Sequence, residues 1–444
     1  MSPATPLDES FWSDAIETRE LQPPLRGPLD AGVALVGGGF TSLTAALRLK
    51  RQRPELEVAV LESRHVGHGA SGRNAGMVLA EAHLDRVRDL GARSVRFTWE
   101  SVTSMVDAIE AVALEEGFDC GLERTGYLEI AYHPVHLRRA RAAAAACAEL
   151  GVPLRVLDAE ATRDRIASAR FAGALSHPRA ALLHPGRYVA GLKRAALRRG
   201  VRIFESSPVT GLRQGREIEL TTPEDDVGGA HPPLGGGQLG LNAYLPASGL
   251  SPIRDRAVTL HSFILLTERL SPAQRESLGW AGREGWSDMR RLHNYVRLVG
   301  DRLLFGGRVV YHFGLEAPGG IDVIYARLQA ELRRTFPTLG ALSAGRRWAG
   351  PVSISPRRTP VIGSAGRFGN LHYAVGYSGM GVSLATLAGR VLADVVLGEG
   401  ARWDDLVYRR DRPWPLPPEP LRYLGFQGSF LGMRLADAWD ALRG

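Results

Sequence analysis

The sequence predicts an α/β fold in which a domain built on a parallel sheet carries an inserted α+β domain built on an antiparallel sheet. Three observations lead to this fold class. Residues 32–62 follow the order strand, glycine turn, helix, strand and acid. Residues 371–397 repeat the strand, glycine turn and helix, and strand patterns with a hairpin lie between the two segments. A chain of 444 residues is too long for one ordinary domain and suits two.

The first glycine turn is flanked by two apolar runs, residues 33–36 and 58–61, which are typical of strands buried on both faces. Gly37, Gly38 and Gly39 follow the first run, and apolar residues then recur at helical spacing up to residue 49. Glu62 ends the second run. This order is typical of the βαβ unit that binds a dinucleotide, so we expect a Rossmann-like domain.

These residues match the physical needs of a dinucleotide site. Gly37 permits the tight turn, and Gly39 lets the backbone approach a pyrophosphate without an intervening Cβ. The helix that starts near Phe40 offers free N–H groups and a positive dipole end to the phosphates. Glu62 can accept hydrogen bonds from a ribose hydroxyl. Ser42 replaces the third glycine of the motif and is small enough to allow close packing of helix and strand.

A second glycine-rich segment, residues 67–76, follows directly after Glu62 and reads Gly-His-Gly-Ala-Ser-Gly-Arg-Asn-Ala-Gly. An enzyme that binds NAD has no need of such a segment there. With it, the sequence resembles the D-amino-acid oxidase superfamily of FAD enzymes, which includes glycine oxidase, sarcosine oxidase and gamma-glutamylputrescine oxidase. The run Phe305-Gly-Gly-Arg308 and the turn 376–381 follow in family order, so the resemblance covers nearly the whole chain.

The resemblance implies an FAD site made from several parts of the chain. Segment 67–76 would wrap the pyrophosphate and the ribityl chain. The backbone of Val209 would contact the adenine side, although core packing explains this valine equally well. Turn 376–381 would bring a helix start to the pyrimidine edge of the flavin, where N–H groups stabilise negative charge. The expected cofactor-binding residues are Gly37, Gly39, Phe40, Thr41, Ser42, Glu62, Ser63, Gly69, Ala70, Ser71, Arg73, Asn74, Ala75, Gly76, Val209, Gly363, Gly376, Ser378, Met380 and Gly381.

The family reaction is oxidation of a C–N bond, in which a neutral amine loses a hydride to the flavin and the resulting imine hydrolyses. By resemblance, the expected catalytic residues are Tyr377, Gly379, Arg308 and Tyr295. We expect Tyr377 to face the substrate. Arg308 would pair with a substrate anion, and a structural salt bridge explains it equally well. His372, also a candidate for the pocket, lies on an apolar strand, where a histidine is more often part of the core.

Three departures from the family pattern bear on how FAD is attached, which substrate binds and which molecule accepts the electrons. Pro351 or its neighbours and Arg73 stand where covalent members attach FAD, so we expect dissociable FAD. The turn that begins at Trp348 is followed by Pro351, Val352 and Ser353 instead of the arginine that binds an amino-acid carboxylate, which favours a larger amine. Phe305 takes the place of the lysine that aids reaction with oxygen. The electron acceptor is therefore oxygen or another molecule.

Composition excludes several other classes of protein. The net charge is +8, but arginine supplies 53 of the 55 basic residues and is scattered among acids, so we expect a solvated surface and no nucleic-acid partner. No apolar run is long enough to span a membrane. Cys120 and Cys147 lack metal-ligand spacing, so we expect no metal and no disulfide framework. A cytoplasmic location is the default, and a homo-oligomer stays open.

We expect the FAD-binding domain to be discontinuous, built from 30–85, 150–222 and 340–410, with a substrate domain formed by 86–149 and 242–339. Residues 1–29 should form an N-terminal arm whose aromatic pair docks on the body, and residues 411–444 a C-terminal tail. The glycine- and proline-rich segment 223–241 reads as an irregular loop, which leaves one strand of the cofactor sheet short or missing.

Three functions remain open on the sequence. The first is an FAD-dependent amine oxidoreductase similar to gamma-glutamylputrescine oxidase. The second is an amino-acid or aminophosphonate oxidoreductase on the same fold. The third, suggested by Ser42 and by segment 223–238, is a flavin-binding homologue without turnover.

Overall fold

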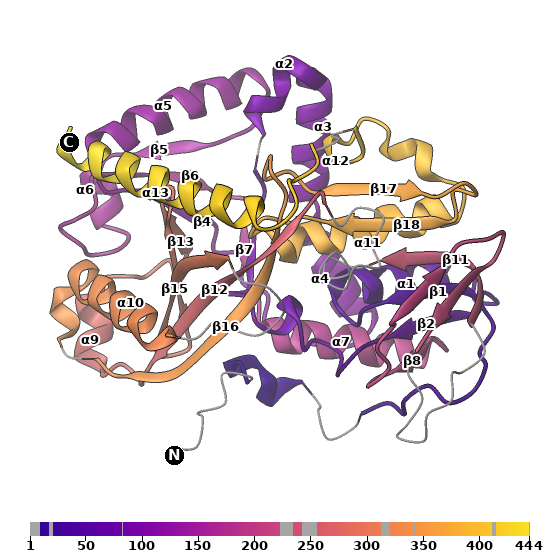
Figure 1. The fold of residues 1–444 in the computed structure, drawn as a ribbon. Coiled ribbons are helices and arrows are strands. Elements are labelled where there is room, and N and C mark those ends of the chain that lie inside the picture. Colours follow the sequence, from indigo (N-terminus) through magenta and orange to yellow (C-terminus); the bar gives the residue numbers. More distant parts are fainter. Residues whose placement is uncertain are drawn as a thin grey trace.

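The computed structural model describes residues 9–16, 21–81, 83–222, 234–241, 255–311, 320–340, 342–410 and 414–443. Two eight-stranded sheets organise these residues, one in each half of the molecule (Figure 1). A small third sheet pairs β3 (Met77–Val78) with β7 (Ala181–Leu182). The observed class is the predicted one, an α/β domain combined with a second domain on a mainly antiparallel sheet.

The first sheet has the order β17-β18-β11-β1-β2-β8, and β10 and β9 extend it beside β11. Strands β18, β11, β1, β2 and β8 are parallel, which is the arrangement expected of a dinucleotide-binding domain. The strands are β1 (Ala31–Val36), β2 (Val58–Leu61), β8 (Arg202–Phe204), β9 (Gly211–Arg213), β10 (Ile218–Thr221), β11 (Leu234–Leu241), β17 (Val361–Ala365) and β18 (Leu371–Val375).

Strand β11 corrects the prediction of an irregular loop over 223–241. Residues 234–241 pair in parallel with β1 on one edge and with β18 on the other. Glycine has a low intrinsic preference for strands, but a central strand gains hydrogen bonds on both edges, and the backbone alone makes them. Residues 223–233, and the Asn-Ala-Tyr turn expected at 242–244, lie outside the described residues.

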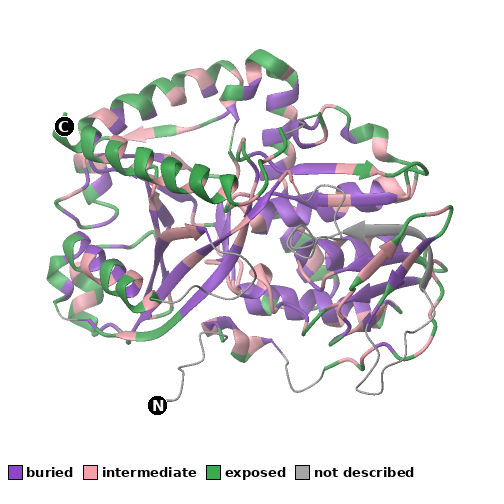
Figure 2. Cartoon of the chain, in the orientation of Figure 1, coloured by how far each residue is buried: buried purple, intermediate pink, exposed green. Residues whose placement is uncertain are grey.

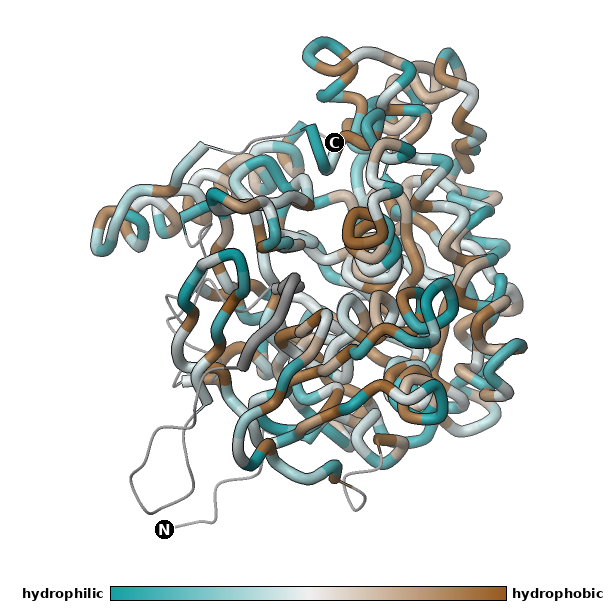
Figure 3. Tube along the Cα trace, turned by 90° about the vertical axis from the view of Figure 1, so that its right-hand side faces the viewer, coloured by the Kyte–Doolittle hydropathy of each residue, from teal (hydrophilic) through white to brown (hydrophobic). Residues whose placement is uncertain are grey.

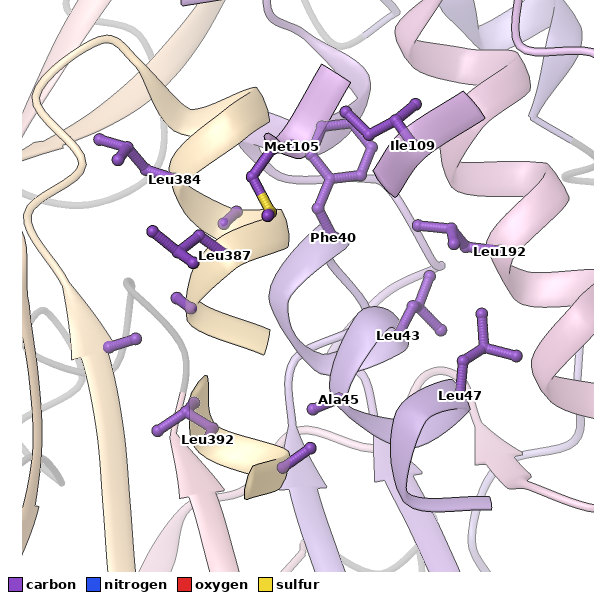
Figure 4. Packing of buried hydrophobic residues seen from close by; sticks show 14 of the residues in the cluster. Phe40, Leu43, Ala45, Leu47, Met105, Ile109, Leu192, Leu384, Leu387 and Leu392 are labelled. Atoms are coloured by element: carbon purple, nitrogen blue, oxygen red, sulfur yellow. The ribbon is translucent and has the colours of Figure 1, made fainter. Parts of the chain in front are cut away.

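Three helices cover this sheet and share one apolar core. Helix α1 (Phe40–Gln52) packs between α7 (Pro185–Arg198) and α11 (Gly381–Val396). Figure 4 shows Leu43 and Leu47 of α1 facing Leu192 of α7, with Leu387 of α11 on the other side. This core fixes the starts of α1 and α11, which both follow a glycine turn.

Helices α3 (Ala92–Thr103) and α4 (Met105–Glu115) join the same core, although we predicted 86–149 for the substrate domain. Met105 and Ile109 of α4 point toward Phe40 (Figure 4), and both α3 and α4 contact α11. The helical pattern was correct. Which sheet the helices cover depends on their contacts in three dimensions, which sequence order does not reveal.

The second sheet has the order β16-β12-β15-β14-β13-β4-β6-β5. Strands β5, β6 and β16 belong to it, whereas we predicted 150–222 and 340–410 for the cofactor domain. The expected hairpin is present as β14 and β15. The strands are β4 (Tyr127–Ala131), β5 (Arg155–Leu157), β6 (Gly173–His177), β12 (Val258–Thr267), β13 (Gly285–Asp288), β14 (Asn294–Val299), β15 (Arg302–Tyr311) and β16 (Ala344–Ile354).

Helix α10 lies on one face of this second sheet, and α5 lies on the other face, which is turned toward the first domain. Helix α10 packs on β12 and β15, and α5 packs beside β5 and β6. The chain also contains the helices α2 (Val87–Leu90), α5 (Pro134–Glu149), α6 (Ala159–Arg163), α9 (Pro272–Ser277), α10 (Ile321–Thr335), α12 (Val407–Arg410), η2 (Ala70–Gly72), η3 (Leu84–Arg86), η4 (Pro337–Leu339) and η5 (Gly400–Trp403). Helices α2, α6, α9 and α12 are short.

The first and the last described elements of the chain dock on the body. The turn η1 (Phe11–Ala15) buries Trp12, which confirms the docking of the aromatic pair. Helix α13 (Leu421–Leu442) lies along the outside and is exposed over much of its length (Figure 2). Hydrophobic residues follow the strands and inner helices, and hydrophilic residues are frequent in the outer loops (Figure 3). Among the described residues, no helix combines the length and apolar character needed to cross a membrane.

Candidate active site

A large cavity lies between the two eight-stranded sheets. Its volume is about 1620 Å³, above the roughly 300–1,000 Å³ of an ordinary small-molecule site. The glycine turns after β1 and β18 line one side, and strands of the second sheet line the other. The cavity therefore has room for a dinucleotide together with a second molecule.

The first glycine turn is held by the acid that follows β2. Gly37 has a φ of 98°, a left-handed conformation that favours glycine. The N–H of Gly38 donates to Glu62 Oε2 at 2.6 Å, and a Cβ on Gly38 would lie 2.9 Å from Val66 Cγ2. Burial raises the pKa of Glu62, although hydrogen bonds from the Gly38 and Arg64 N–H groups oppose this shift. The carboxylate keeps lone pairs available for a ribose hydroxyl.

The loop 69–76 is fixed against both domains. Ser71 Oγ accepts the N–H of Phe40 at 3.0 Å, which joins the loop to the start of α1. Two buried tryptophans bracket it: Trp12 Nε1 donates to the Asn74 carbonyl at 2.8 Å, and Trp348 Nε1 donates to the Arg73 carbonyl at 2.9 Å. The loop therefore keeps one shape at the junction of the two sheets.

The second glycine turn brings the start of α11 to the cavity. Gly379 has a φ of 97°, and a Cβ there would meet no atom within 4 Å. Ser378 also has a positive φ, 51°, and its N–H donates to the Ser353 carbonyl at 2.9 Å. The first-turn N–H groups of a helix have no partner within the helix, so the α11 start is a source of hydrogen-bond donors and positive potential.

The opposite wall is a row of residues that crosses six strands of the second sheet. Strand pairing links Leu175 to Glu129, Glu129 to Ser287 and Ser287 to Tyr295. The ring of Tyr295 covers Gly306, where a Cβ would lie 2.1 Å from it, and the row ends at Ile264. All except Gly306 line the cavity. Tyr295 Oη lies 3.0 Å from Ser262 Oγ, and burial raises the pKa of Tyr295 to about 12.

Most of the predicted site residues line this cavity. Ser42, Gly76, Gly363 and Gly376 do not: a Cβ on Gly363 would meet the Tyr373 hydroxyl at 2.7 Å, and one on Gly376 would meet Ser355 at 3.0 Å, so both glycines serve packing. His372 is buried in β18, as a core histidine would be. The predicted residues at the cavity are Gly37, Gly39, Phe40, Thr41, Glu62, Ser63, Gly69, Ala70, Ser71, Arg73, Asn74, Ala75, Val209, Tyr295, Tyr377, Ser378, Gly379, Met380 and Gly381.

Three predicted roles need correction. Arg308 sits in a bulge of β15, where the register with β12 shifts, so Gly307 and Val309 line the cavity and Arg308 does not. Phe305 lies fully buried in the core on the other face of the sheet, away from the cavity. The Tyr377 hydroxyl bonds to Thr41 Oγ1 at 2.7 Å, on the first turn of α1, so it is not directed to the substrate side.

The sequence reasoning missed the charged part of the cavity wall. Glu129, Asp288, His293 and Arg358 line it, although none belongs to a recognised motif. One signal was available: on the strand at 127–131, Tyr127 and Glu129 alternate with apolar residues, which indicates that one face of the strand meets a polar environment. Helix α13 also contributes to the wall, through Phe426, Ser429, Phe430 and Met433.

The geometry defines a class of protein. A dinucleotide-type glycine turn, a loop fixed to it and two helix starts converge on one cavity beneath a mainly antiparallel sheet. The N–H donors of these elements fit the phosphates and the flavin ring of FAD. The fold and site are those of a dinucleotide-dependent oxidoreductase with a substrate chamber. The chain belongs to the FAD dependent oxidoreductase (DAO) family, whose model matches residues 32–395. FAD is therefore its cofactor.

Sequence relatives and solved structures agree with this family. The chain is 30% identical to gamma-glutamylputrescine oxidoreductase of Escherichia coli, over 88% of this chain and 89% of the relative. It is also 30% identical to the probable oxidoreductase OrdL of Haemophilus influenzae, over the same shares. The fold is similar to that of glycine oxidase from Geobacillus kaustophilus, with a TM-score of 0.70 and 21% identity over 87% of this chain and 100% of that structure.

Proposed function

We propose that this FAD-dependent oxidoreductase oxidises the C–N bond of an amine. The observation that carries the proposal is the cavity itself, in which the start of α11 lies opposite a wall of hydroxyl and apolar side chains with room for a second molecule. The similarity to gamma-glutamylputrescine oxidoreductase supports an amine as substrate. When bound, FAD accepts a hydride from the carbon that bears the amine.

The chain's own groups position the reactants and stabilise charge. The N–H groups at the start of α11, beside Gly379 and Gly381, provide donors for the negative charge that reduction places on the cofactor. Tyr295, with its raised pKa, stays a neutral hydroxyl at physiological pH. It can therefore orient an amine by a hydrogen bond but does not act as a strong base there.

The expected non-covalent binding of FAD has structural support. Cys120 and Cys147 are buried and free, and neither lines the cavity. The two positions that correspond to covalent attachment in relatives, Pro351 and Arg73, do line it. Because His68, His261 and His293 also line the cavity, acid precipitation is the deciding measurement: FAD should stay in the supernatant, and flavin that remains in the pellet would contradict this part of the proposal.

A second candidate substrate is an amino acid or an aminophosphonate. One observation favours it: Arg358 lies exposed at the cavity, and no described carboxylate lies within salt-bridge distance of it. Against it, the cavity-lining residues after the Trp348 turn are Pro351, Val352 and Ser353, where an arginine would be expected for a substrate carboxylate. The acceptor is oxygen or another molecule. A cytoplasmic location and a homo-oligomer stay predictions from the sequence.

The test is a panel of amines, amino acids and aminophosphonates mixed with the yellow holoenzyme without oxygen. We expect amines to bleach the flavin absorbance and amino acids to do so more slowly or not at all. Admitting oxygen, and in a parallel sample an artificial acceptor, then distinguishes oxidase from dehydrogenase by the rate at which the colour returns. Failure of every amine to bleach the flavin would contradict the proposal.

A further inference from the structure

Glu129 presents a free carboxylate surface to the cavity. Tyr127 and Glu129 line the cavity, whereas Leu128 and Ile130, the alternating residues of β4, pack into the opposite core. The Glu129 side chain keeps 39% of its surface accessible, and that surface opens into the cavity. Its one close partner among the described residues is His177, whose Nε2 lies 2.7 Å from Oε1. The second carboxylate oxygen remains available to a ligand.

A neighbouring carboxylate shows what a purely structural acid looks like in this wall. Asp288 has a fully buried side chain. Its two oxygens accept hydrogen bonds from Arg290 at 2.8 and 2.7 Å and from the Asn294 N–H at 2.9 Å. Nothing of Asp288 is left for a substrate. Glu129 differs in both respects, because it is accessible and has a single side-chain partner.

The surroundings of Glu129 keep it ionised. Burial raises its pKa, but the contact with His177 and the nearby His293 and Arg358 outweigh this effect, and the pKa of Glu129 is lowered overall. A negative charge is therefore held in an otherwise hydroxyl-bearing and apolar row.

We propose that Glu129 is a specificity-determining residue that binds a second cationic group of the amine substrate, at a distance from the amine that reacts. This inference rests on the proposed function, with the reacting amine placed beneath Tyr295. Glu129 and Tyr295 stand in the same row, two strands apart, which is a spacing of about 10 Å. The structure thus favours an elongated diamine, or another amine with a distal cation, over a simple monoamine.

The test compares octylamine with the eight-carbon α,ω-diamine, which differs only in its distal ammonium group. The apparent Kd of each is measured from the rate of flavin reduction in the holoenzyme without oxygen, for the wild type and for Glu129→Gln. The readout is the ratio of the two Kd values, because this ratio cancels the general effect of the mutation on the cavity. We expect Glu129→Gln to raise the Kd of the diamine by about tenfold or more, as for the loss of a hydrogen bond between charged groups. The Kd of octylamine and the limiting reduction rates of both amines should stay within about twofold of the wild-type values.

Further variants control for charge and folding. Glu110→Gln removes an exposed carboxylate on α4 that pairs with Arg124 at 2.5 Å, outside the cavity, and should leave the ratio unchanged. His177→Gln keeps the Glu129 carboxylate and should retain the preference for the diamine. Putrescine, the four-carbon diamine, is too short to span the row and should gain nothing from Glu129.

The outcomes separate this inference from the proposed function. If no amine reduces the flavin, the proposed function fails. If amines do reduce it and Glu129→Gln leaves the ratio of Kd values unchanged, or weakens both amines equally, Glu129 is only the partner of His177 and the inference is overturned. If Glu129→Gln does not fold, two other measurements decide: the ratio of the octylamine and diamine Kd values in His177→Gln, and the Kd of the eight-carbon diamine compared with that of putrescine. Loss of the preference for the eight-carbon diamine in both measurements overturns the inference.

Discussion

At the scale of single residues, Tyr377 joins the two glycine turns of the site. Its hydroxyl bonds to Thr41 Oγ1 at 2.7 Å in a buried position, so it links the turn before α11 to the first turn of α1. We expect Tyr377→Phe to lower the free energy of unfolding by about 1 kcal/mol and to weaken FAD binding, with little effect on which amine is preferred. Denaturant unfolding and titration of the apoprotein with FAD measure these effects.

Thr41→Val provides the matched control for Tyr377→Phe, because it removes the other partner of the same hydrogen bond at nearly constant shape. The double variant should lower the free energy of unfolding little more than either single variant does. This corresponds to a coupling energy of about 1 kcal/mol between the two side chains. A normal FAD affinity together with an altered amine preference in Tyr377→Phe would show that the hydroxyl faces the substrate after all.

Gly38 provides a second prediction at this scale, because its environment leaves no space for a side chain. In Gly38→Ala the new Cβ would lie 2.9 Å from Val66 Cγ2 and 3.2 Å from Glu62 Cβ, and the turn would have to move. Overpacking of this kind costs roughly 1–3 kcal/mol, so we expect FAD to bind about tenfold more weakly or worse. Gly428→Ala on the exposed α13, where a Cβ meets nothing within 4 Å, should leave FAD affinity unchanged.

At the scale of elements, α13 acts as part of the cavity wall. Asp440 anchors it: Arg139 donates to its two oxygens at 2.6 and 2.9 Å, and Arg291 donates at 2.8 Å. These bonds lower the pKa of Asp440. A carboxyl group whose pKa is lowered in the folded state stabilises the fold at pH values above the ordinary Asp pKa. This stabilisation is lost only as the pH falls toward the pKa of the folded state. The docking of α13 therefore persists at neutral and mildly acidic pH.

A chain that ends after residue 420 tests this role of α13. Phe426, which stacks on Tyr311 at 4.8 Å, and Phe430 and Met433 would be removed from the cavity. We expect FAD to remain bound, because the glycine turns lie elsewhere. The apparent Kd of a long amine should rise by about tenfold, which is less than the burial of one large apolar side chain contributes. Stopped-flow reduction measures this Kd.

Leu431→Ser is the control for the truncation, since Leu431 points out of the exposed face of the same helix. It should leave the amine Kd unchanged. An unchanged Kd in the truncated chain as well would mean that α13 covers the cavity without contacting the substrate.

At the scale of the whole molecule, one half-buried and one buried histidine make the fold sensitive to acid. Burial lowers the pKa of His184, helped by Arg187, and of His372, to about 4 in each case. The unfolded chain takes up these protons near the ordinary value of about 6.5. Between these two values the unfolded chain binds more protons, so the free energy of unfolding should fall as the pH drops from about 6.5 to about 4.

Denaturant unfolding across this pH range tests the effect. His372→Asn should flatten the pH dependence, because the asparagine can keep a hydrogen bond to Ser364 Oγ, which His372 Nδ1 approaches at 2.7 Å, without taking up a proton. A slope equal to that of the wild type would show that the acid sensitivity arises from other groups.

The sequence by itself determined the cofactor half of the molecule. This half contains elements that are adjacent in the chain and interact locally: two strands, the turn at Gly37, the helix from Phe40 and the acid at Glu62. Their sequence pattern was therefore enough to predict their geometry. The same holds for the turn before α11 and for the hairpin of β14 and β15. Strand β11 escaped detection because its glycines have no strand preference of their own, and only its neighbours β1 and β18 give it a place.

Only the tertiary structure decided the substrate half. The row from Leu175 through Glu129 to Tyr295 comes from strands far apart in the chain, and strand pairing alone brings it together. A bulge in β15 keeps Arg308 out of the cavity, although simple inspection of the motif placed it there. The physical reason is the same in both cases. The register between strands and the packing of helices are long-range properties, and they decide which side chains of a correctly predicted element face the site.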